Sequence, residues 1–272
     1  MSILTLRDEA IMNGSLSSAA QRKWRVINAL LIRELMARFG HRNIGFLWQV
    51  VEPLLLCLGV MISWSVLYGE RNHGVRVIPL VLTGYTFLTL WRHMPARLTH
   101  AFRQGSGLLF HRSVKPIDIL IARGLLEAIG VLIAFFVAYI PLEMLEIISP
   151  VDDYLVLLGA WSLMCFFSFG AAMLIVAIAH FSDVFERMVQ PIMYLILPLT
   201  GVFYMVYWLP PFARKAVLYS PLVHAMEMFR AGYFGKAVPT FWSLSYLLVW
   251  SIVINALGLV LVLKAQRHIE LE

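Results

Sequence analysis

The chain has few charged residues and almost no cysteine for its length. Of its 272 residues, only 14% are charged and 60% are hydrophobic. An ordinary soluble domain carries about 25% charged residues, so this composition argues against one and is typical of a protein that crosses a membrane several times. The two cysteines, Cys57 and Cys165, both lie inside apolar runs. Neither a disulfide framework nor a redox motif is therefore expected.

The sequence also lacks the patterns of several enzyme classes. It contains no GxxxxGK[ST] phosphate loop, and its eight histidines show no HExxH or similar metal-ligand spacing. A membrane-embedded polyprenyl-linked sugar transferase would need cytoplasmic carboxylates or histidines, and the paired acids Asp152 and Asp153 are predicted to lie on the other side. That enzyme is kept as the less favoured alternative. The N-terminus lacks the apolar core of a secretory signal peptide, so we expect no removable signal.

Long apolar runs are what the sequence has in abundance. Four runs are long enough to cross a bilayer: residues 48–68, 117–140, 154–179 and 243–263. A fifth run, 77–91, is short unless it continues through Arg92, and a sixth, 188–211, holds four prolines. Helix breaks at membrane depth are tolerated where protein or water satisfies the freed backbone groups. We therefore predict an all-α polytopic membrane protein with six transmembrane helices and re-entrant segments after the fifth span.

The basic residues predict how these spans are oriented. The segments on one side of the six spans carry fifteen lysines and arginines, and those on the other side carry six. The positive-inside rule then places both termini in the cytoplasm. The expected organisation is a single transmembrane domain with a flexible cytoplasmic tail (1–23), an interfacial helix (24–46), the six spans (48–263) and a second cytoplasmic tail (264–272).

The segment before the first span has the pattern of an amphipathic helix. Apolar residues recur every three or four positions from Trp24 to Phe39, while Arg22, Arg25 and Arg33 fall on the other side. Such a helix lies flat in the membrane interface. Two interpretations stay open: a basic anchor for anionic lipid, or a functional surface at the cytoplasmic entry. The entry residues would be Arg33, Arg38 and Arg42.

The segment between the second and third spans carries a second basic cluster. Its cations are Arg97, Arg103, Arg112 and Lys115, and Pro116 opens the next helix. This segment either fixes topology by its charge or docks a cytoplasmic protein. Further along, Arg123 and Glu127 stand one turn apart near the cytoplasmic end of the third span. We expect these two residues to form an intrahelical pair with a structural role.

Three stretches carry a resemblance to a known family. "LLIRELMARFGHRNIGFLWQVVEP", "GLLFHRSVKPIDILIARGLLE" and "SPLVHAMEMFR" are similar to the KpsM-type inner-membrane permeases of capsular-polysaccharide ABC exporters. The likeness runs from about residue 24 to the C-terminus, and "VKPIDILIARGLLE" is its most specific part. The first stretch is shared with O-antigen and teichoic-acid export permeases, which stay as alternatives. The stretch "WRHMPARLTHAF" is more basic than the family pattern.

The resemblance implies a transporter subunit rather than an enzyme. The chain would form a homodimer in the bacterial inner membrane and move lipid-linked capsular polysaccharide from the cytoplasm to the periplasm. Two separate ATPase subunits would dock on the basic segment, through Arg97, Arg103, Arg112 and Lys115, and bind the ATP and magnesium. This chain would hold no cofactor or metal and bind no nucleic acid. A periplasmic adaptor and an outer-membrane export protein are the further expected partners.

Two groups of residues are candidates for the substrate pathway. Arg92 and His93, near the cytoplasmic end of the second span, suit an anionic polymer or lipid phosphate, although an arginine there can also snorkel to the interface. The second group consists of aromatic rings on which sugars stack; the alternative is an aromatic belt at the outer interface. The aromatic candidates are Tyr194, Phe203, Tyr204, Tyr207 and Trp208. Glu227 and Arg230 are expected to fix loop packing instead.

Overall fold

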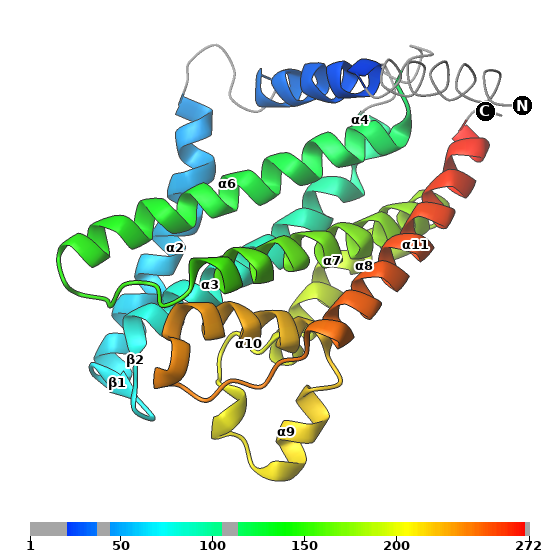
Figure 1. Ribbon diagram of the computed structural model, residues 1–272. Helices are drawn as coiled ribbons and strands as arrows, with labels where there is room; N and C mark the ends of the chain where they lie inside the picture. Colours follow the sequence, from blue (N-terminus) through cyan, green and yellow to red (C-terminus); the bar gives the residue numbers. More distant parts are fainter. Residues whose placement is uncertain (1–20, 37–43, 105–113, 270–272) are drawn as a thin grey trace, which may run out of the picture.

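The computed structural model describes residues 21–36, 44–104 and 114–269, and most of them are helical (Figure 1). The first described helix spans residues 21–36. The elements that follow are α2 (Ile44–Tyr68), β1 (Arg71–Asn72), β2 (Val75–Arg76), α3 (Val77–Thr99), α4 (Ala101–Gln104), α6 (Pro116–Met144), α7 (Tyr154–Phe181), α8 (Asp183–Leu195), the 3₁₀ turns η2 (Leu197–Thr200) and η3 (Val206–Trp208), α9 (Pro211–Val217), α10 (Pro221–Phe234), η4 (Gly235–Ala237) and α11 (Leu244–Ile269). The two short strands pair antiparallel as a hairpin.

Three of the described helices are long and apolar enough to cross a membrane: α6, α7 and α11. They correspond to the runs predicted at 117–140, 154–179 and 243–263. On α6, apolar side chains such as Ile129, Ile133 and Val137 are exposed at a spacing of four residues. Such a stripe has no favourable contact with water, so it is suited to the hydrocarbon of a bilayer. The all-α prediction is confirmed.

Helix α3 differs from these three because it is less apolar and mostly buried. It begins at Val77, as predicted, and continues past Arg92 to Thr99, packed against α2, α6 and α7. Thr83, Thr86 and Thr89 each donate a hydroxyl hydrogen bond of 2.8 Å to a backbone carbonyl one turn earlier. These bonds satisfy polar groups that protein neighbours, rather than lipid, surround. A modestly polar sequence therefore forms the central helix of the bundle.

The segment after α7 is broken, as its prolines predict. Helix α8 starts at Asp183, five residues earlier than the predicted run, because the Ser182 hydroxyl accepts a hydrogen bond from the backbone N–H of Phe185. It ends at Leu195 and is followed by η2, which begins with Leu197 and Pro198. Gly201 then adopts a left-handed conformation with φ of 75°. The chain continues through η3 into α9, so no single helix covers 188–211.

Helices α7 and α11 cross at very close range, and glycine makes the approach feasible. A Cβ atom added to Gly258 would stand 2.8 Å from the carbonyl oxygen of Gly170. One added to Gly170 would stand 2.8 Å from the backbone nitrogen of Asn255. The Asn255 side chain donates a 2.7 Å hydrogen bond to the carbonyl of Phe166 across the same contact. Small residues and an interhelical hydrogen bond are typical of helices that pack in a membrane.

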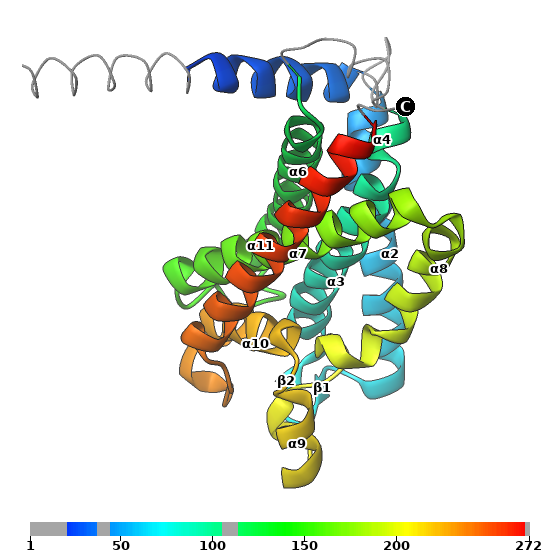
Figure 2. The same ribbon diagram turned by 90° about the vertical axis from the view of Figure 1, so that its right-hand side faces the viewer.

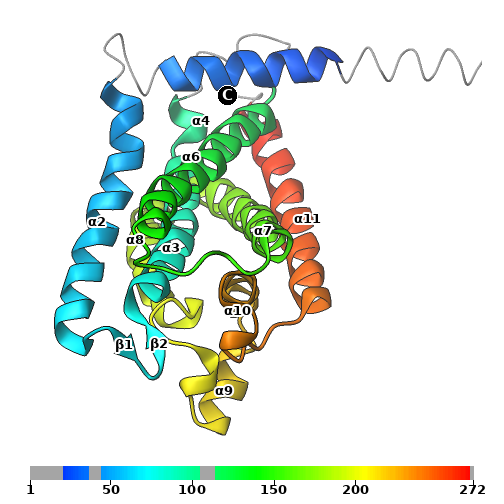
Figure 3. The ribbon, with the colours of Figure 1, turned by 60° about the vertical axis from the view of Figure 1, so that its left-hand side comes forward.

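The helix at residues 21–36 lies across one end of the bundle, next to α4, the start of α6 and the end of α11 (Figures 1, 2 and 3). The β1–β2 hairpin, α9 and α10 lie toward the opposite end. Three predicted boundaries shift: residues 21–23 are helical rather than part of a tail, residues 44–46 belong to α2 rather than to the interfacial helix, and α11 continues through residues 264–269. The rest of the predicted N-terminal tail, together with residues 37–43, falls outside the described residues.

Candidate functional site

A carboxylate with no solvent exposure stands at the end of the bundle that carries the N-terminal helix. Glu127 of α6 has a side chain that is 0% exposed, and its Oε1 lies 3.6 Å from Nε of Arg97 on α3. Nδ1 of His93, one turn earlier on α3, lies 3.9 Å from Glu127 Oε2. A buried carboxylate is strongly disfavoured unless cationic or hydrogen-bonding groups surround it. Glu127 therefore fixes how α3 and α6 sit against each other.

Two ion pairs attach the N-terminal helix to the first turns of α6. Nζ of Lys23 lies 2.6 Å from Oδ1 of Asp118, and Nη2 of Arg123 lies 3.1 Å from Oε1 of Glu34. The second pair is nearly buried, with side-chain exposures of 7% for Arg123 and 12% for Glu34. Asp118 also accepts a hydrogen bond from the backbone N–H of Lys115, so it caps α6 while it holds Lys23. The N-terminal helix, α6 and α3 are thus connected through charges.

Arg123 and Glu127 were predicted to pair with each other, but the ion pairs of both residues are with other helices. Each of these residues instead contacts a different helix: Arg123 reaches Glu34, and its Nη1 donates to the Arg97 carbonyl at 3.5 Å. Glu127 faces His93 and Arg97 on α3. Spacing along one helix identifies only neighbours on that helix, so it could not reveal these long-range partners. The structural role that we expected for the two residues does fit their contacts.

Arg92 of α3 and His100, the residue directly after the end of α3, contact α8. Arg92 donates a 2.7 Å hydrogen bond to the hydroxyl of Tyr194, and its guanidinium carbon lies 4.5 Å from the centroid of that ring. Nδ1 of His100 lies 2.8 Å from Oε1 of Glu186. Arg92 and Tyr194 were both predicted as pathway residues, and the structure brings them into direct contact. The contact combines a charged hydrogen bond with a cation–π interaction.

The opposite end of the bundle is held by a second buried pair on α10. Arg230 is fully buried and donates to the carbonyls of Gly201, Val202 and Tyr204 at 2.6–2.9 Å. Glu227 accepts hydrogen bonds from two backbone N–H groups, those of Val206 and Phe241. As predicted, the pair fixes loop packing, here on both sides of α10.

The aromatic candidates divide into packed rings and exposed ones. The Tyr207 hydroxyl donates to the His73 carbonyl at 3.0 Å, and Trp208 stacks on the His73 ring with centroids 4.8 Å apart. These two rings therefore pack against the β1–β2 hairpin. Tyr204 donates to the Pro198 carbonyl at 3.0 Å. Phe203 and Tyr194 are about half exposed, at 45% and 53%, and so remain accessible to a ligand.

Two of the remaining basic candidates, Arg33 and Lys115, lie at the end of the bundle that the N-terminal helix crosses. Arg33 is exposed on that helix, and Lys115 is exposed at the start of α6. Arg103 belongs to α4, but its side chain falls outside the described residues, as do Arg38, Arg42 and Arg112. Sequence analysis missed five charged residues of this end: Lys23, Glu34, His100, Asp118 and Glu186. In the sequence, each of these residues is only an ionisable residue next to an apolar run. That pattern does not reveal which residue it contacts.

Comparison with known proteins identifies the family of this chain. The sequence profile described as "ABC-2 type transporter" matches residues 25–234, more than half of the chain. The chain belongs to the ABC-2 type transporter family. It is therefore a transporter component rather than an enzyme. The match begins within the N-terminal helix and ends at the last residue of α10.

Individual relatives of this ABC-2 chain share most of its length. It is 37% identical over 246 residues to the capsule polysaccharide export inner-membrane protein BexB of Haemophilus influenzae, covering 90% of this chain and 93% of BexB. It is 37% identical over 254 residues to CtrC of Neisseria meningitidis serogroup B, which has the same description, covering 93% and 95%. The polysialic acid transport protein KpsM of Escherichia coli is 27% identical over 245 residues, covering 86% and 91%. The resemblance to the KpsM-type family is confirmed.

The Glu34–Arg123 ion pair generates the first prediction. Glu34→Gln and Arg123→Gln should each destabilise the protein by about 3 to 5 kcal/mol, because each leaves a nearly buried charge without its partner. The double variant should lose less than the sum of the two. The measurement is the thermal unfolding midpoint of the purified protein in lipid nanodiscs.

Arg33→Gln is the matched control, because Arg33 is the exposed neighbour of Glu34 on the same helix. It should leave the midpoint nearly unchanged. Strictly additive effects of Glu34→Gln and Arg123→Gln would contradict a direct interaction between the two side chains.

Proposed function

We propose that this chain is the permease subunit of an ATP-driven exporter that moves lipid-linked capsular polysaccharide from the cytoplasm across the inner membrane to the periplasm. The observation that carries the proposal is the likeness to BexB and CtrC, which extends over about nine tenths of all three chains. O-antigen and teichoic-acid export are the alternatives within the same class. A polyprenyl-linked sugar transferase is disfavoured by the family.

Energy for transport comes from a partner in this proposal. The chain has no phosphate loop, so ATP and magnesium bind to separate ATPase subunits. The assembly contains two copies of this permease and two ATPase subunits. On the far side of the membrane, a periplasmic adaptor and an outer-membrane export protein receive the polymer.

The proposed topology has six spans and both termini in the cytoplasm. The excess of basic residues on one side supports the orientation. The helix at residues 21–36 supports an interfacial position, because it crosses the end of the bundle instead of running along it (Figure 3). Its exposed Arg22, Arg25 and Arg33 would then face the headgroups and the cytoplasm.

Helix α8 with the broken backbone up to η3 forms the proposed fifth span, and α10 is the proposed re-entrant segment that follows it. Helices α8 and α10 have 13 and 14 residues and so extend about 20 Å each, short of a hydrocarbon core of roughly 30 Å. Between them Arg230 satisfies three backbone carbonyls of the turn at Gly201, and Glu227 satisfies two N–H groups. Irregular backbone at membrane depth needs such internal partners. The Arg230–Glu227 pair thus supports a gate built from half-helices.

The basic segment from the end of α3 to the start of α6 is the proposed ATPase-docking surface. Arg97 and Lys115 are exposed there, and Arg103 and Arg112 belong to the same stretch of the sequence. The ion pairs of Glu127, Asp118 and Glu34 connect this segment to α3, α6 and the N-terminal helix. A displacement produced by the ATPase would therefore reach three helices together.

The proposed substrate pathway begins at Arg92 and His93 and continues along the aromatic rings. Arg92 lies on the half-exposed Tyr194, where a charged donor and a sugar-stacking ring stand side by side. That combination fits an anionic polysaccharide. Tyr207 and Trp208 pack on the hairpin in this structure, so in the proposal they contact polymer only when the hairpin moves.

The docking surface generates the second prediction. Arg103→Glu combined with Arg112→Glu should release the ATPase subunits and abolish export, because the reversed charges repel the acidic surface that the basic segment would bind. The permease should still insert and form dimers. The measurement is co-purification of the ATPase together with surface polysaccharide per cell.

The matched control is Lys215→Glu combined with Lys236→Glu, the same charge change at exposed sites near the opposite end of the bundle. The control should retain the ATPase. Unchanged co-purification in the Arg103/Arg112 variant would show that the basic segment serves topology only.

The pathway generates the third prediction. Arg92→Ala should lower surface polysaccharide roughly tenfold or more at matched permease abundance, since a charged hydrogen bond contributes about 1.5 to 3 kcal/mol. Arg92→Lys should restore export only in part, because lysine lacks the bidentate geometry. His93→Ala should have a smaller effect.

Tyr194→Phe separates substrate binding from packing, because it keeps the ring under Arg92 and removes the hydroxyl. Near-normal export in Tyr194→Phe is expected. Loss of export equal to that of Arg92→Ala would mean that Arg92 acts by holding α8, and normal export in Arg92→Ala would reduce Arg92 to a snorkelling anchor.

A further inference from the structure

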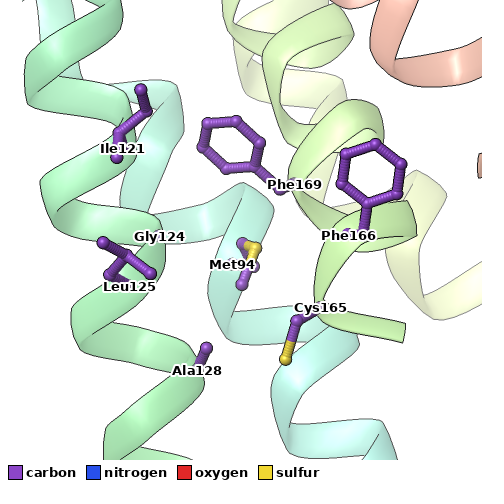
Figure 4. A pocket seen from close by; sticks show the side chains of 8 residues that line it. All are labelled: Met94, Ile121, Gly124, Leu125, Ala128, Cys165, Phe166 and Phe169. Atoms are coloured by element: carbon purple, nitrogen blue, oxygen red, sulfur yellow. The ribbon is translucent and has the colours of Figure 1, made fainter. Parts of the chain in front are cut away.

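An apolar cavity of about 250 Å³ lies between α3, α6 and α7 (Figure 4). Helix α6 forms one wall and α7 the other, and Met94 of α3 lies between them as the floor. Every lining residue is apolar. The lining residues are Met94, Ile121, Gly124, Leu125, Ala128, Cys165, Phe166 and Phe169.

Small residues on α6 create this cavity. A Cβ atom on Gly124 would stand 2.8 Å from the ring of Phe169, so only glycine lets that ring approach α6. One turn further along, the methyl group of Ala128 leaves space that a larger side chain would fill. Met94 is 1% exposed and closes the cavity from behind. The cavity is thus open on the side away from α3.

The open side of the cavity faces outward, between two helices that are suited to cross the membrane. Leu125 and Phe166 stand on its two walls and are 39% and 43% exposed. Both α6 and α7 are long enough and apolar enough to cross a membrane. Ile121 and Ala128 follow the start of α6 by five and twelve residues, which places the cavity roughly 8 to 18 Å from that end along the inclined axis of α6, at a smaller depth. Such a depth lies among the acyl chains of one leaflet.

The chemistry and size of the cavity restrict what can fill it. Water is disfavoured because the walls offer no hydrogen-bond partner, and apolar cavities stay dry. An empty space is unfavourable because its walls lose packing contacts. A helix is about 10 to 12 Å wide with its side chains, too wide to enter. A cavity of about 150 Å³ accepts a benzene molecule, so 250 Å³ accommodates a segment of a hydrocarbon chain.

Basic residues near the open side of the cavity indicate which lipid headgroup is attached to that hydrocarbon chain. The described helix at 21–36 carries the exposed Arg22, Arg25 and Arg33, while its Lys23 pairs with Asp118 and its Glu34 with Arg123. It lies next to the start of α6, where Lys115 is also exposed (Figure 1). A basic surface at headgroup level attracts anionic lipid at about 1 kcal/mol per basic residue. The headgroup and the chain site therefore lie at compatible depths on the same helix.

We propose that the groove between α6 and α7 binds one acyl chain of an anionic phospholipid from the cytoplasmic leaflet. The lipid acts as a structural ligand that fills the space beside Gly124 and Ala128. Its phosphate lies among the basic residues at the start of α6. The proposal rests on the proposed topology, in which α6 and α7 span the membrane and α6 starts on the cytoplasmic side, and it does not depend on which polymer is exported.

Photo-crosslinking tests the proposal. The permease is expressed in cells that make no capsular polysaccharide and reconstituted with phosphatidylglycerol carrying a diazirine in mid-chain. Adducts are mapped by mass spectrometry of peptides. We expect adducts concentrated on the peptide that contains Cys165 and Phe166, and a reduction of at least fivefold when Ala128→Phe fills the groove.

Ile129→Phe is the matched control, because Ile129 is the next residue on α6 and its side chain is 52% exposed outside the groove. It should label like the unsubstituted protein. If Ala128→Phe fails to fold, Cys165→Met fills the groove from α7 and should give the same loss. The same diazirine on phosphatidylcholine should label at least threefold less.

Three outcomes would overturn the proposal. Ala128→Phe and Ile129→Phe would label equally if no acyl chain occupied the groove. Where Ala128→Phe does not fold, the same comparison is made between Cys165→Met and Ile129→Phe. Equal labelling by phosphatidylglycerol and phosphatidylcholine would show that the site has no preference for an anionic headgroup. Labelling by phosphatidylglycerol that falls at least fivefold when the permease is purified from cells making the polymer would identify the native occupant as the lipid anchor of the substrate.

Discussion

A carboxylate without solvent exposure near the end of a membrane bundle constrains everything around it. Glu127 loses all contact with water, and the approach of Arg97 and His93 of α3 offsets this loss. The position of α3 against α6 is therefore fixed in the half of the bundle nearer the N-terminal helix. Arg123, one turn before Glu127, turns to Glu34 and brings the N-terminal helix into the same group. The geometry of the proposed docking surface follows from this one buried charge.

The buried charges of the bundle lie toward its two ends, and its middle is held by other forces. Threonine hydroxyls bonded within α3, and glycines that let α7 and α11 touch, do not require charge compensation. At the far end Arg230 and Glu227 bind backbone groups of two loops. Each end therefore behaves as a polar clamp. An exporter with this design could rearrange one clamp while the apolar packing between them persists.

The sequence predicted the elements of this fold better than their contacts. Apolar runs identified α6, α7 and α11, and the prolines from Pro191 to Pro211 identified the break after α8, because both signals are local. Arg123 was assigned to Glu127, since periodicity sees only neighbours on one helix, whereas its partner Glu34 is 89 positions away. The contact between Tyr207 and His73 spans 134 positions and was equally inaccessible. Candidate residues could be named from composition, but their partners required the fold.

The central claim is that the ion pairs make the N-terminal helix, α3 and α6 one body that responds to the ATPase as a unit. Electron–electron distance measurements in the permease–ATPase complex test whether these helices move as one body. Cys57 and Cys165 are replaced by alanine, and only one permease of each dimer carries spin labels. Spin labels at Arg25 and Ile129 report the N-terminal helix against α6, and labels at Ile129 and Phe212 report the opposite end; all three residues are exposed. On trapping ATP, the Ile129–Phe212 distance should change and the Arg25–Ile129 distance should not. A shift of the Arg25–Ile129 distance would contradict the account.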